Sequence, residues 1–116
     1  MNHQAAERVL LAVEQIPAGR VVAYGDVARI VGVGPRQVGA VLRERGHEVA
    51  WWRVVNAAGV LPAEILQRAL PRWDAEGVPL ASDGRGCAIR RCRADLERLA
   101  SDYYAALLDW PAGSPA

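Results

Sequence analysis

Hydrophobic positions are most regularly spaced between residues 24 and 42, where they predict two short helices joined by a tight turn. Gly32-Val33-Gly34 interrupts the pattern, and Pro35 suits the start of the second helix because a proline at the first helical position loses no hydrogen bond. This arrangement is typical of a helix-turn-helix, whose second helix usually contacts DNA. The expected buried positions are Val27, Ala28 and Val31 in the first helix and Val38, Val41 and Leu42 in the second.

The opposite side of the second helix carries Arg36, Gly39, Ala40 and Arg43. A cation in the first turn opposes the helix dipole, at a cost of roughly 0.3–1 kcal/mol, so Arg36 is unusual there. The small residues Gly39 and Ala40 leave the backbone nearly bare, so a large flat surface could approach it closely. The alternative is a packed helical hairpin with a solvated arginine.

Hydrophobic spacing predicts three further helices, at about residues 4–16, 62–76 and 93–108. Pro71 is expected to kink or break the second of these. Their apolar faces are Val9, Leu10, Val13 and Ile16 in the first, Ile65, Leu66, Ala69, Leu70 and Trp73 in the second, and Leu96, Leu99, Tyr103 and Leu107 in the third.

The segments between the helices are short. Residues 20–23 form an extended lead-in, residues 43–48 a polar loop with a solvated His47, and residues 80–89 a small hairpin. Residues 49–55 are rich in aromatic and β-branched side chains, which indicates a buried strand or loop. Two adjacent tryptophans on an extended segment, Trp51 and Trp52, would point to opposite sides.

Length and charge narrow the class of protein. A chain of 116 residues with a mean hydropathy of +0.02 predicts one globular domain, here residues 1–110 with a flexible tail at 111–116. The net charge of +1 gives no general argument for nucleic acid, and every basic side chain is arginine. Residues 20–53 nevertheless contain six arginines and three acidic residues, which allows a local basic face, although GC-rich coding also favours arginine.

The sequence contains two cysteines, Cys87 and Cys92, without zinc-ligand spacing. We interpret them as reduced thiols of a cytoplasmic protein, and we expect no metal and no cofactor. No signal peptide and no membrane-spanning run is recognisable, so no membrane partner is expected.

Three motifs follow one another in a defined order: Tyr24-Gly25-Asp26, Arg36-Gln37-Val38-Gly39 and Ala50-Trp51-Trp52-Arg53-Val54-Val55-Asn56. In order and spacing they resemble the DNA-binding domain of the O6-alkylguanine-DNA alkyltransferases, over roughly residues 9–78. The resemblance implies a mainly α fold with small β elements, a winged-helix-like helix-turn-helix domain. Trp51 stands where these enzymes carry the alkyl-accepting cysteine, which is the mark of their non-enzymatic relatives, the alkyltransferase-like proteins.

The chemistry agrees with the non-enzymatic branch. Direct reversal needs a thiolate activated by a nearby base, and an indole cannot accept an alkyl group from guanine. Trp52 stands where the family has histidine, so the base is missing too. Glu76 matches the third member of the enzymes' proton relay and is left with a structural hydrogen bond. Cys87 and Cys92 lie well past the motif and are poor substitutes.

The resemblance also assigns roles to single residues. Arg36 would enter the base stack where the damaged nucleotide leaves, and Tyr24 would push on the backbone phosphate while the second helix occupies the minor groove. Arg68 would stack on the flipped base, a cation–π contact worth roughly 0.5–2 kcal/mol. Arg53 would mainly hold the pocket loop. The DNA-binding set is Tyr24, Arg36, Gln37, Gly39, Ala40 and Arg43, and the lesion-pocket set is Trp51, Trp52, Arg53, Asn56 and Arg68.

Several positions depart from the family pattern. Ala50 replaces the motif proline, and Trp52 replaces a histidine that many relatives with Trp at the acceptor position keep. Leu61-Pro62-Ala63-Glu64 replaces a glycine-rich loop, so the pocket is expected to be more open and to admit bulkier adducts.

The resulting hypothesis is a monomer that binds O6-alkylguanine in double-stranded DNA, flips it without alkyl transfer and flags it for nucleotide-excision-repair proteins, in the cytoplasm and on the nucleoid when bound to DNA. One alternative is a sequence-specific transcription regulator, although no heptad seam for a dimer is visible. Another is an active methyltransferase that uses a different cysteine. The cluster Arg90, Arg91 and Arg93 predicts a solvated helix start, or else a contact to phosphate or to a repair partner.

Overall fold

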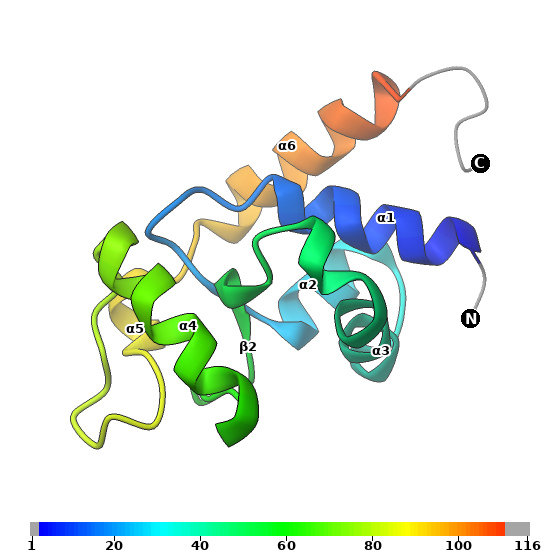
Figure 1. Cartoon of the computed structure of the whole chain (residues 1–116). Helices are drawn as coiled ribbons and strands as arrows, with labels where there is room; N and C mark the ends of the chain where they lie inside the picture. The colour runs from blue at the N-terminus through cyan, green and yellow to red at the C-terminus, as the bar shows by residue number, and fades with distance from the viewer. Residues whose placement is uncertain (1–2, 111–116) are drawn as a thin grey trace.

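The computed structural model describes residues 3–110, so the tail predicted at 111–116 lies outside the described residues. Within residues 3–110, six helices and two very short strands follow one another (Figure 1). The helices are α1 (His3–Glu14), α2 (Tyr24–Val31), α3 (Pro35–Arg45), α4 (Ala63–Glu76), α5 (Ile89–Cys92) and α6 (Leu96–Leu108); the strands are β1 (Val22–Ala23) and β2 (Val54–Val55); two 3-10 turns are η1 (Gly46–Glu48) and η2 (Trp51–Arg53).

The helix-turn-helix predicted from the hydrophobic pattern is formed by α2 and α3. Gly32 ends α2 in the left-handed conformation, at φ +89°, and the N–H groups of Gly32 and Val33 both donate to the Ala28 carbonyl, at 2.8 and 3.0 Å. Gly34 precedes Pro35, and its N–H donates to the side-chain carbonyl of Gln37 at 2.8 Å. The turn therefore has the chemistry that its sequence predicts.

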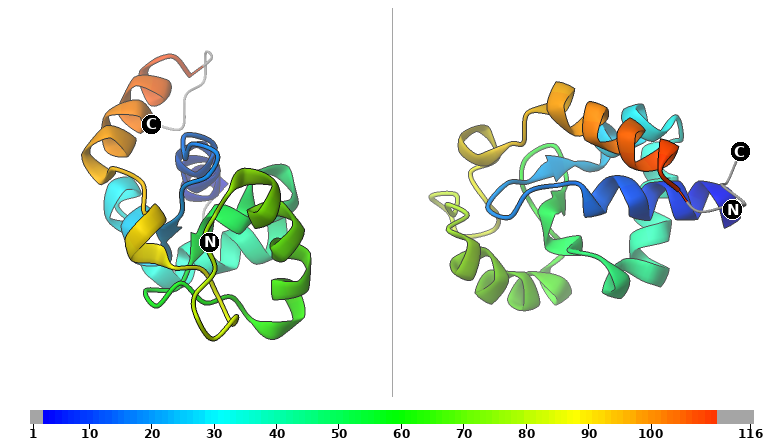
Figure 2. Two further views of the ribbon diagram at one scale, coloured as in Figure 1. Left: turned by 90° about the vertical axis from the view of Figure 1, so that its left-hand side faces the viewer. Right: turned by 90° about the horizontal axis from the view of Figure 1, so that it is seen from above.

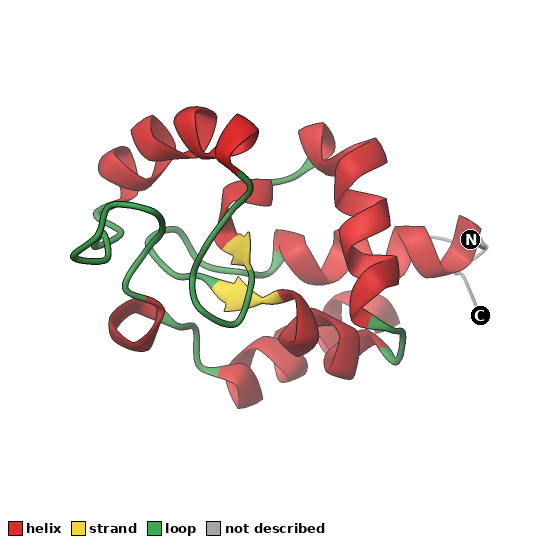
Figure 3. Ribbon diagram, turned by 90° about the horizontal axis from the view of Figure 1, so that it is seen from below, coloured by secondary structure: helices red, strands yellow, loops and turns green. Residues whose placement is uncertain are grey.

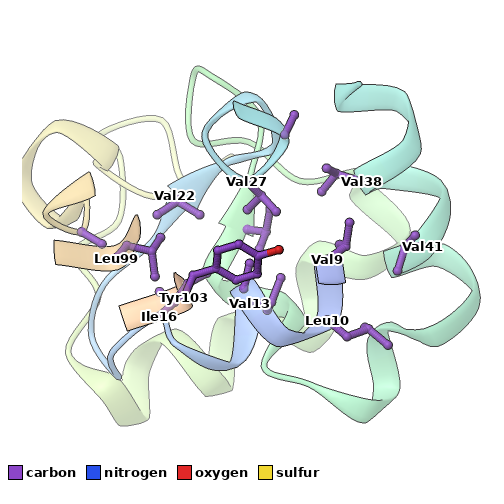
Figure 4. Close-up of a cluster of buried hydrophobic side chains, with 14 residues drawn as sticks. Val9, Leu10, Val13, Ile16, Val22, Val27, Val38, Val41, Leu99 and Tyr103 are labelled. Atoms are coloured by element: carbon purple, nitrogen blue, oxygen red, sulfur yellow. The ribbon is translucent and has the colours of Figure 1, made fainter. Parts of the chain in front are cut away.

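The first hydrophobic core lies where α1, α2, α3 and α6 meet, and Figure 4 shows the ring of Tyr103 among its aliphatic side chains. Helix α6 packs along α1, as Figure 2 shows from above, and contributes the buried side chains Leu99 and Tyr103. The buried side of the helix-turn-helix is thus packed against α1 and α6, the first and last helices of the described residues. The buried members are Val9, Leu10, Ala12, Val13, Ile16, Val22, Val27, Ala28, Val38, Val41, Val54, Ala94, Leu99 and Tyr103.

A second core lies beneath α4. Trp73 is completely buried there, and its indole N–H donates to the carbonyl of Trp52 at 2.7 Å. That bond ties α4 to the turn that carries the two adjacent tryptophans. The buried members are Val21, Val55, Leu61, Ala69, Trp73, Val78, Cys87 and Cys92.

The two strands pair in parallel, with Val22 opposite Val54 and Ala23 opposite Val55. Seen from below, α3 and α4 flank this small sheet (Figure 3). The expected extended lead-in at residues 20–23 therefore becomes one of two strands. Because β1 runs directly into Tyr24 and β2 follows η2, the sheet holds the start of α2 beside the tryptophan turn.

Residues 49–55, predicted as a buried strand or loop, divide into a turn and a short strand. Only Val54–Val55 is strand, and Trp51–Arg53 is a 3-10 turn. The rings of Trp51 and Trp52 consequently meet edge to face, with centroids 5.7 Å apart and planes at 86°, instead of pointing to opposite sides of an extended chain.

The polar loop predicted at residues 43–48 is also mostly helical, because α3 continues to Arg45 and η1 follows it. Arg45 explains the extra length: its guanidinium donates to Glu48 at 2.8 and 2.9 Å and to Glu7 on α1 at 2.6 Å. These ion pairs fasten the end of α3 to α1.

Helix α4 does not break at Pro71. A proline in a helix interior costs about 3 kcal/mol, yet Ala69 and Trp73 on either side of it are fully buried in the second core. Tertiary packing therefore outweighs the local penalty, and the helix is drawn without interruption in Figure 2.

The C-terminal elements differ from the prediction in their boundaries. Residues 93–95 are not helical, and α6 begins at Leu96 after Asp95, whose carboxylate accepts from the N–H of Arg98 at 3.1 Å. The predicted hairpin at 80–89 does close, through Ala81 N–H to Gly86 carbonyl at 2.9 Å and Ala88 N–H to Pro79 carbonyl at 2.8 Å.

Within residues 3–110, none of the helices has the length and hydrophobicity that crossing a membrane requires. The same residues contain no group of three or more histidine, cysteine or acidic side chains able to hold a metal ion.

Candidate nucleic-acid interface

A pocket of about 600 Å³ opens between the helix-turn-helix and α4. Its wall combines the aromatic rings of Tyr24 and Trp51, two arginines and several aliphatic side chains. Residues from six separate elements and the loop before α4 contribute: Tyr24, Gly39, Leu42, Arg43, Gly46, His47, Trp51, Val54, Leu61, Pro62, Glu64, Ile65 and Arg68.

Trp51 is the aromatic surface of this pocket. It is half-buried, and the guanidinium carbon of Arg68 lies 5.3 Å from its ring centroid. A Cβ added to Gly46 would lie 3.3 Å from the Trp51 Cβ, so the backbone of η1 supports the tryptophan closely. Because Arg68 is exposed, the solvent-facing side of its guanidinium is open to a flat ligand.

Tyr24 lies at the edge of the same pocket, in the first turn of α2. Burial raises the pKa of its hydroxyl, and the nearby positive charge of Arg43 only partly opposes that effect. The hydroxyl is therefore protonated at neutral pH. It can donate a hydrogen bond to an anionic phosphate oxygen without charge repulsion.

The outer face of α3 continues from the pocket to the solvent. Arg36 is exposed in the first turn and forms no ion pair with any acidic group among residues 3–110. An added Cβ at Gly39 would meet nothing within 4 Å, so the protein's own packing does not require glycine there. Gln37 and Ala40 are on the same helix outside the pocket, and the side-chain carbonyl of Gln37 is engaged by Gly34.

Trp52, Arg53 and Glu76 form a separate network, which we name the Glu76 clamp. The carboxylate of Glu76 accepts from the indole N–H of Trp52 at 2.9 Å, from Arg53 at 2.7 and 3.1 Å, and from the Gly19 N–H at 3.0 Å. Arg53 also donates to the Ile16 carbonyl at 2.9 Å. The clamp thus joins η2, α4 and the segment that follows α1.

The protonation state of Glu76 follows from these contacts. Burial opposes ionisation, but the hydrogen bonds from Arg53, Gly19 and Trp52 and the charge of Arg53 outweigh it and lower the pKa of Glu76 to about 2. A fixed carboxylate with four donors cannot act as a base near neutral pH. The structural hydrogen bond expected for Glu76 is confirmed.

Three residues assigned to the lesion pocket do not line it: Trp52, Arg53 and Asn56. Trp52 lies within the clamp, with the guanidinium carbons of Arg72 and Arg53 at 4.7 and 5.6 Å from its ring centroid. Asn56 accepts the N–H groups of Ala58 and Val60 at 2.9 and 2.8 Å, which closes the turn after β2. Trp51 and Arg68 are the members of that set that face the pocket.

The two cysteines lie in the second core and do not line the pocket. Both thiols are free and buried. Burial and the proximity of Cys92 raise the pKa of Cys87 to about 12, and burial also raises the pKa of Cys92. Both are therefore neutral thiols and poor nucleophiles at neutral pH.

Two polar lining residues, Glu64 and His47, are in neither of the predicted residue sets. Glu64 lies four residues before Arg68, so the helical repeat itself could have placed both side chains on one face of α4. His47 was expected to be solvated; it is exposed but also lines the pocket. Its position depends on the η1 turn, which the local sequence did not indicate.

Comparison with known proteins agrees with this geometry. Residues 4–78 match the family described as "6-O-methylguanine DNA methyltransferase, DNA binding domain". The chain belongs to this family. The match covers the helix-turn-helix, η2 and all of α4, and it ends before α5 and α6.

Named relatives are of the alkyltransferase-like kind. A "DNA base-flipping protein" of Escherichia coli is 41% identical over 85 residues, which is 68% of this chain and 66% of that protein's own length. "Alkyltransferase-like protein 1" of Schizosaccharomyces pombe is 36% identical over 87 residues, covering 68% of this chain and 81% of the relative.

A solved structure extends the likeness to the fold. The structure of Schizosaccharomyces pombe Atl1 in complex with damaged DNA containing O6-carboxymethylguanine superposes with a TM-score of 0.71 at 28% identity, covering 82% of this chain and 98% of that one. The mainly helical fold with a small sheet is thus the alkyltransferase-like DNA-binding fold.

Proposed function

We propose that this protein binds O6-alkylguanine in double-stranded DNA, rotates the damaged nucleotide into its pocket and leaves the alkyl group in place. The observation that carries the proposal is the pocket itself, in which Trp51 and Arg68 present a flat aromatic and cationic surface beside a helix-turn-helix. The relatives named for base flipping and the relative solved with damaged DNA support the same role.

The DNA-binding step uses α2 and α3. Helix α3 enters the minor groove with Gly39 and Ala40 against the backbone, while Arg36 fills the space that the nucleotide vacates. Tyr24 presses on the adjacent phosphate, to which its protonated hydroxyl donates. Unstacking costs a few kcal/mol, least for a poorly paired base, which itself favours damaged guanine.

The bound base then stacks on Arg68, with Trp51 as a flat wall of the pocket. Stacking on an aromatic ring contributes about 1–3 kcal/mol per base, and the arginine adds a cation–π contact. The loop Leu61–Pro62 forms the apolar side of the pocket, where an alkyl group is accommodated. A volume of about 600 Å³ leaves room for adducts larger than methyl.

No alkyl transfer accompanies binding in this proposal. The indole of Trp51 offers no nucleophile, and the two cysteines are neutral, buried and away from the pocket. The complex therefore persists as a marker of damage, which nucleotide-excision-repair proteins recognise. We further propose that the protein acts as a monomer, in the cytoplasm and on the nucleoid.

The test compares duplexes that differ in a single O6-methylguanine. Wild-type protein is expected to bind the damaged duplex more tightly, to raise the fluorescence of a 2-aminopurine placed beside the lesion and to leave the methyl group on the DNA. Arg36→Ala is expected to remove most of the preference for the lesion. Equal affinity for both duplexes, or recovery of unmodified guanine, would refute the proposal.

A further inference from the structure

Asp26 is the buried charged residue at the start of α2. It is only 2% exposed, and its carboxylate accepts the N–H of Ala23 at 2.8 Å, which closes the first turn of the helix. Tyr24 belongs to that same turn. The geometry around Asp26 therefore decides how Tyr24 is presented to the pocket.

Two arginines neutralise this carboxylate. Arg93 binds it with both arms of its guanidinium, through Nη2 to Oδ1 at 2.6 Å and Nε to Oδ2 at 3.1 Å. Arg29 makes one contact, at 2.9 Å, from a side chain that is 74% exposed. Arg93 is thus the stronger of the two partners, since a two-armed contact fixes both position and orientation.

The backbone around Arg93 is anchored at the same place. Val21, just before β1, donates its N–H to the Cys92 carbonyl at 3.0 Å and accepts the N–H of Ala94 at 2.9 Å. Arg93 lies between these two bonds, next to the strand that leads into Tyr24. Its side chain is therefore delivered to Asp26 by a fixed stretch of chain.

Arg93 lies outside residues 4–78, the segment that matches the family. Arg93 and Asp26 are 67 residues apart, and the family match ends at residue 78. Helix α6, which follows Arg93, adds Leu99 and Tyr103 to the core that also contains Val27 of α2. The C-terminal segment thus contacts α2 through both charge and packing.

We propose that Arg93 is a positioning residue for base flipping, which acts by holding Asp26 and hence Tyr24 in the orientation that reaches the DNA backbone. This inference rests on the proposed function, because it assigns Tyr24 a role in rotating the nucleotide. Arg93 does not line the pocket and acts through its neighbour. Without it, Asp26 keeps a single exposed arginine, and the first turn of α2 gains freedom just where placement matters.

The competing explanation is that Arg93 contacts a DNA phosphate directly. A phosphate contact contributes equally to damaged and undamaged duplex, and its loss lowers the salt dependence by about one counterion. A positioning role instead changes the ratio of the two affinities. The ratio is also insensitive to stability, because partial unfolding reduces active protein equally for both duplexes.

The decisive variant is Arg93→Gln, with Arg29→Gln as the matched control on the same carboxylate. Arg93→Gln is expected to lower the ratio of damaged to undamaged affinity about tenfold, within the range for directly interacting residues, and Arg29→Gln less than about twofold. Arg93→Lys keeps the charge but loses the two-armed contact, so an intermediate fall in the affinity ratio is expected. This variant replaces Arg93→Gln as the test should the glutamine variant not fold.

A double-mutant cycle tests the route through Tyr24. In a Tyr24→Ala background, Arg93→Gln is expected to change the ratio by less than about twofold. An undiminished tenfold loss in that background, an unchanged ratio in the single variant, or an equal loss for both duplexes would each overturn the inference. Failure of the proposed function appears separately, as a wild-type protein that does not prefer the lesion at all.

Discussion

Trp51 and Trp52 are adjacent in sequence, yet their indole rings have different tasks in the structure. Trp51 borders a pocket and has one arginine, Arg68, at 5.3 Å. Trp52 is enclosed by the guanidinium groups of Arg72 and Arg53 and donates its N–H to Glu76. The Trp51 ring is accessible to a ligand, whereas the Trp52 ring is occupied by contacts within the protein.

The comparison shows how one short turn can supply both a pocket wall and a structural hydrogen-bond network. At the position that the resemblance matches to the enzymes' histidine, Trp52 still donates a hydrogen bond to Glu76. The bond that would serve a proton relay therefore remains as a structural support. Because the clamp fixes η2, it also fixes the orientation of Trp51.

The largest effect is expected from breaking the clamp. Glu76→Ala leaves Arg53 without its partner in a partly buried site and is expected to lower the free energy of unfolding by about 3 kcal/mol. Glu64→Ala on the same helix, where the carboxylate is exposed and faces the pocket, is expected to cost less than about 0.5 kcal/mol. Urea unfolding of the two variants measures the difference, and similar losses would contradict the comparison.

The clamp should also give the protein a distinctive acid response. Glu76 has a pKa of about 2 when folded and an ordinary value of 4.5, so the folded state holds the proton more weakly. The stabilisation is therefore complete above pH 5 and is lost as the pH falls toward 2, by about 3 kcal/mol. Urea unfolding at a series of pH values should show this loss, and Glu76→Gln should remove that part of the dependence.

Two arginines on α4 offer a matched pair for separating binding from stability. Arg68 faces Trp51 and Arg72 faces Trp52. Arg68→Ala is expected to weaken binding to O6-methylguanine duplex about fivefold, since a cation–π contact contributes about 1 kcal/mol. Arg72→Ala should leave that binding nearly unchanged, and a larger loss for Arg72→Ala would reverse the assignment of the two rings.

The smallest effects are expected for Gly39→Ala, which should stabilise the protein but weaken its binding to DNA. Gly39→Ala places a methyl group where the protein leaves open space, and should raise the free energy of unfolding by up to about 1 kcal/mol through helix propensity. The same methyl group intrudes on the surface that approaches DNA, and a loss in affinity of about threefold is expected. Unchanged DNA binding would show that Gly39 does not face the duplex.

Local patterns were sufficient for the helix-turn-helix. The spacing of Val27, Val38 and Val41, together with the glycines of the turn and Pro35, depends only on neighbours within a few residues. The same holds for the placement of Arg36 and Gly39 on the exposed face of α3. These features were predicted correctly because helix periodicity and capping act over a single turn.

The different contacts of Trp51 and Trp52 could not be predicted from local sequence patterns. They depend on Glu76, which is 24 residues from Trp52 in sequence, and on Gly19 in the turn that follows α1. The pairing of β1 with β2 and the passage of α4 through Pro71 likewise depend on distant partners. The family resemblance located Trp51 and Arg68 in the pocket, but it did not indicate that Trp52 lies elsewhere.

The burial of both sulfur atoms has a practical consequence. Reagents that alkylate guanine react readily with ionised sulfur, and under the proposed function the protein meets the compounds that cause such damage. Cys87, with a pKa of about 12, and Cys92 offer these electrophiles no exposed anion. Exposure to alkylating reagents is therefore expected to leave both thiols of the folded protein unmodified.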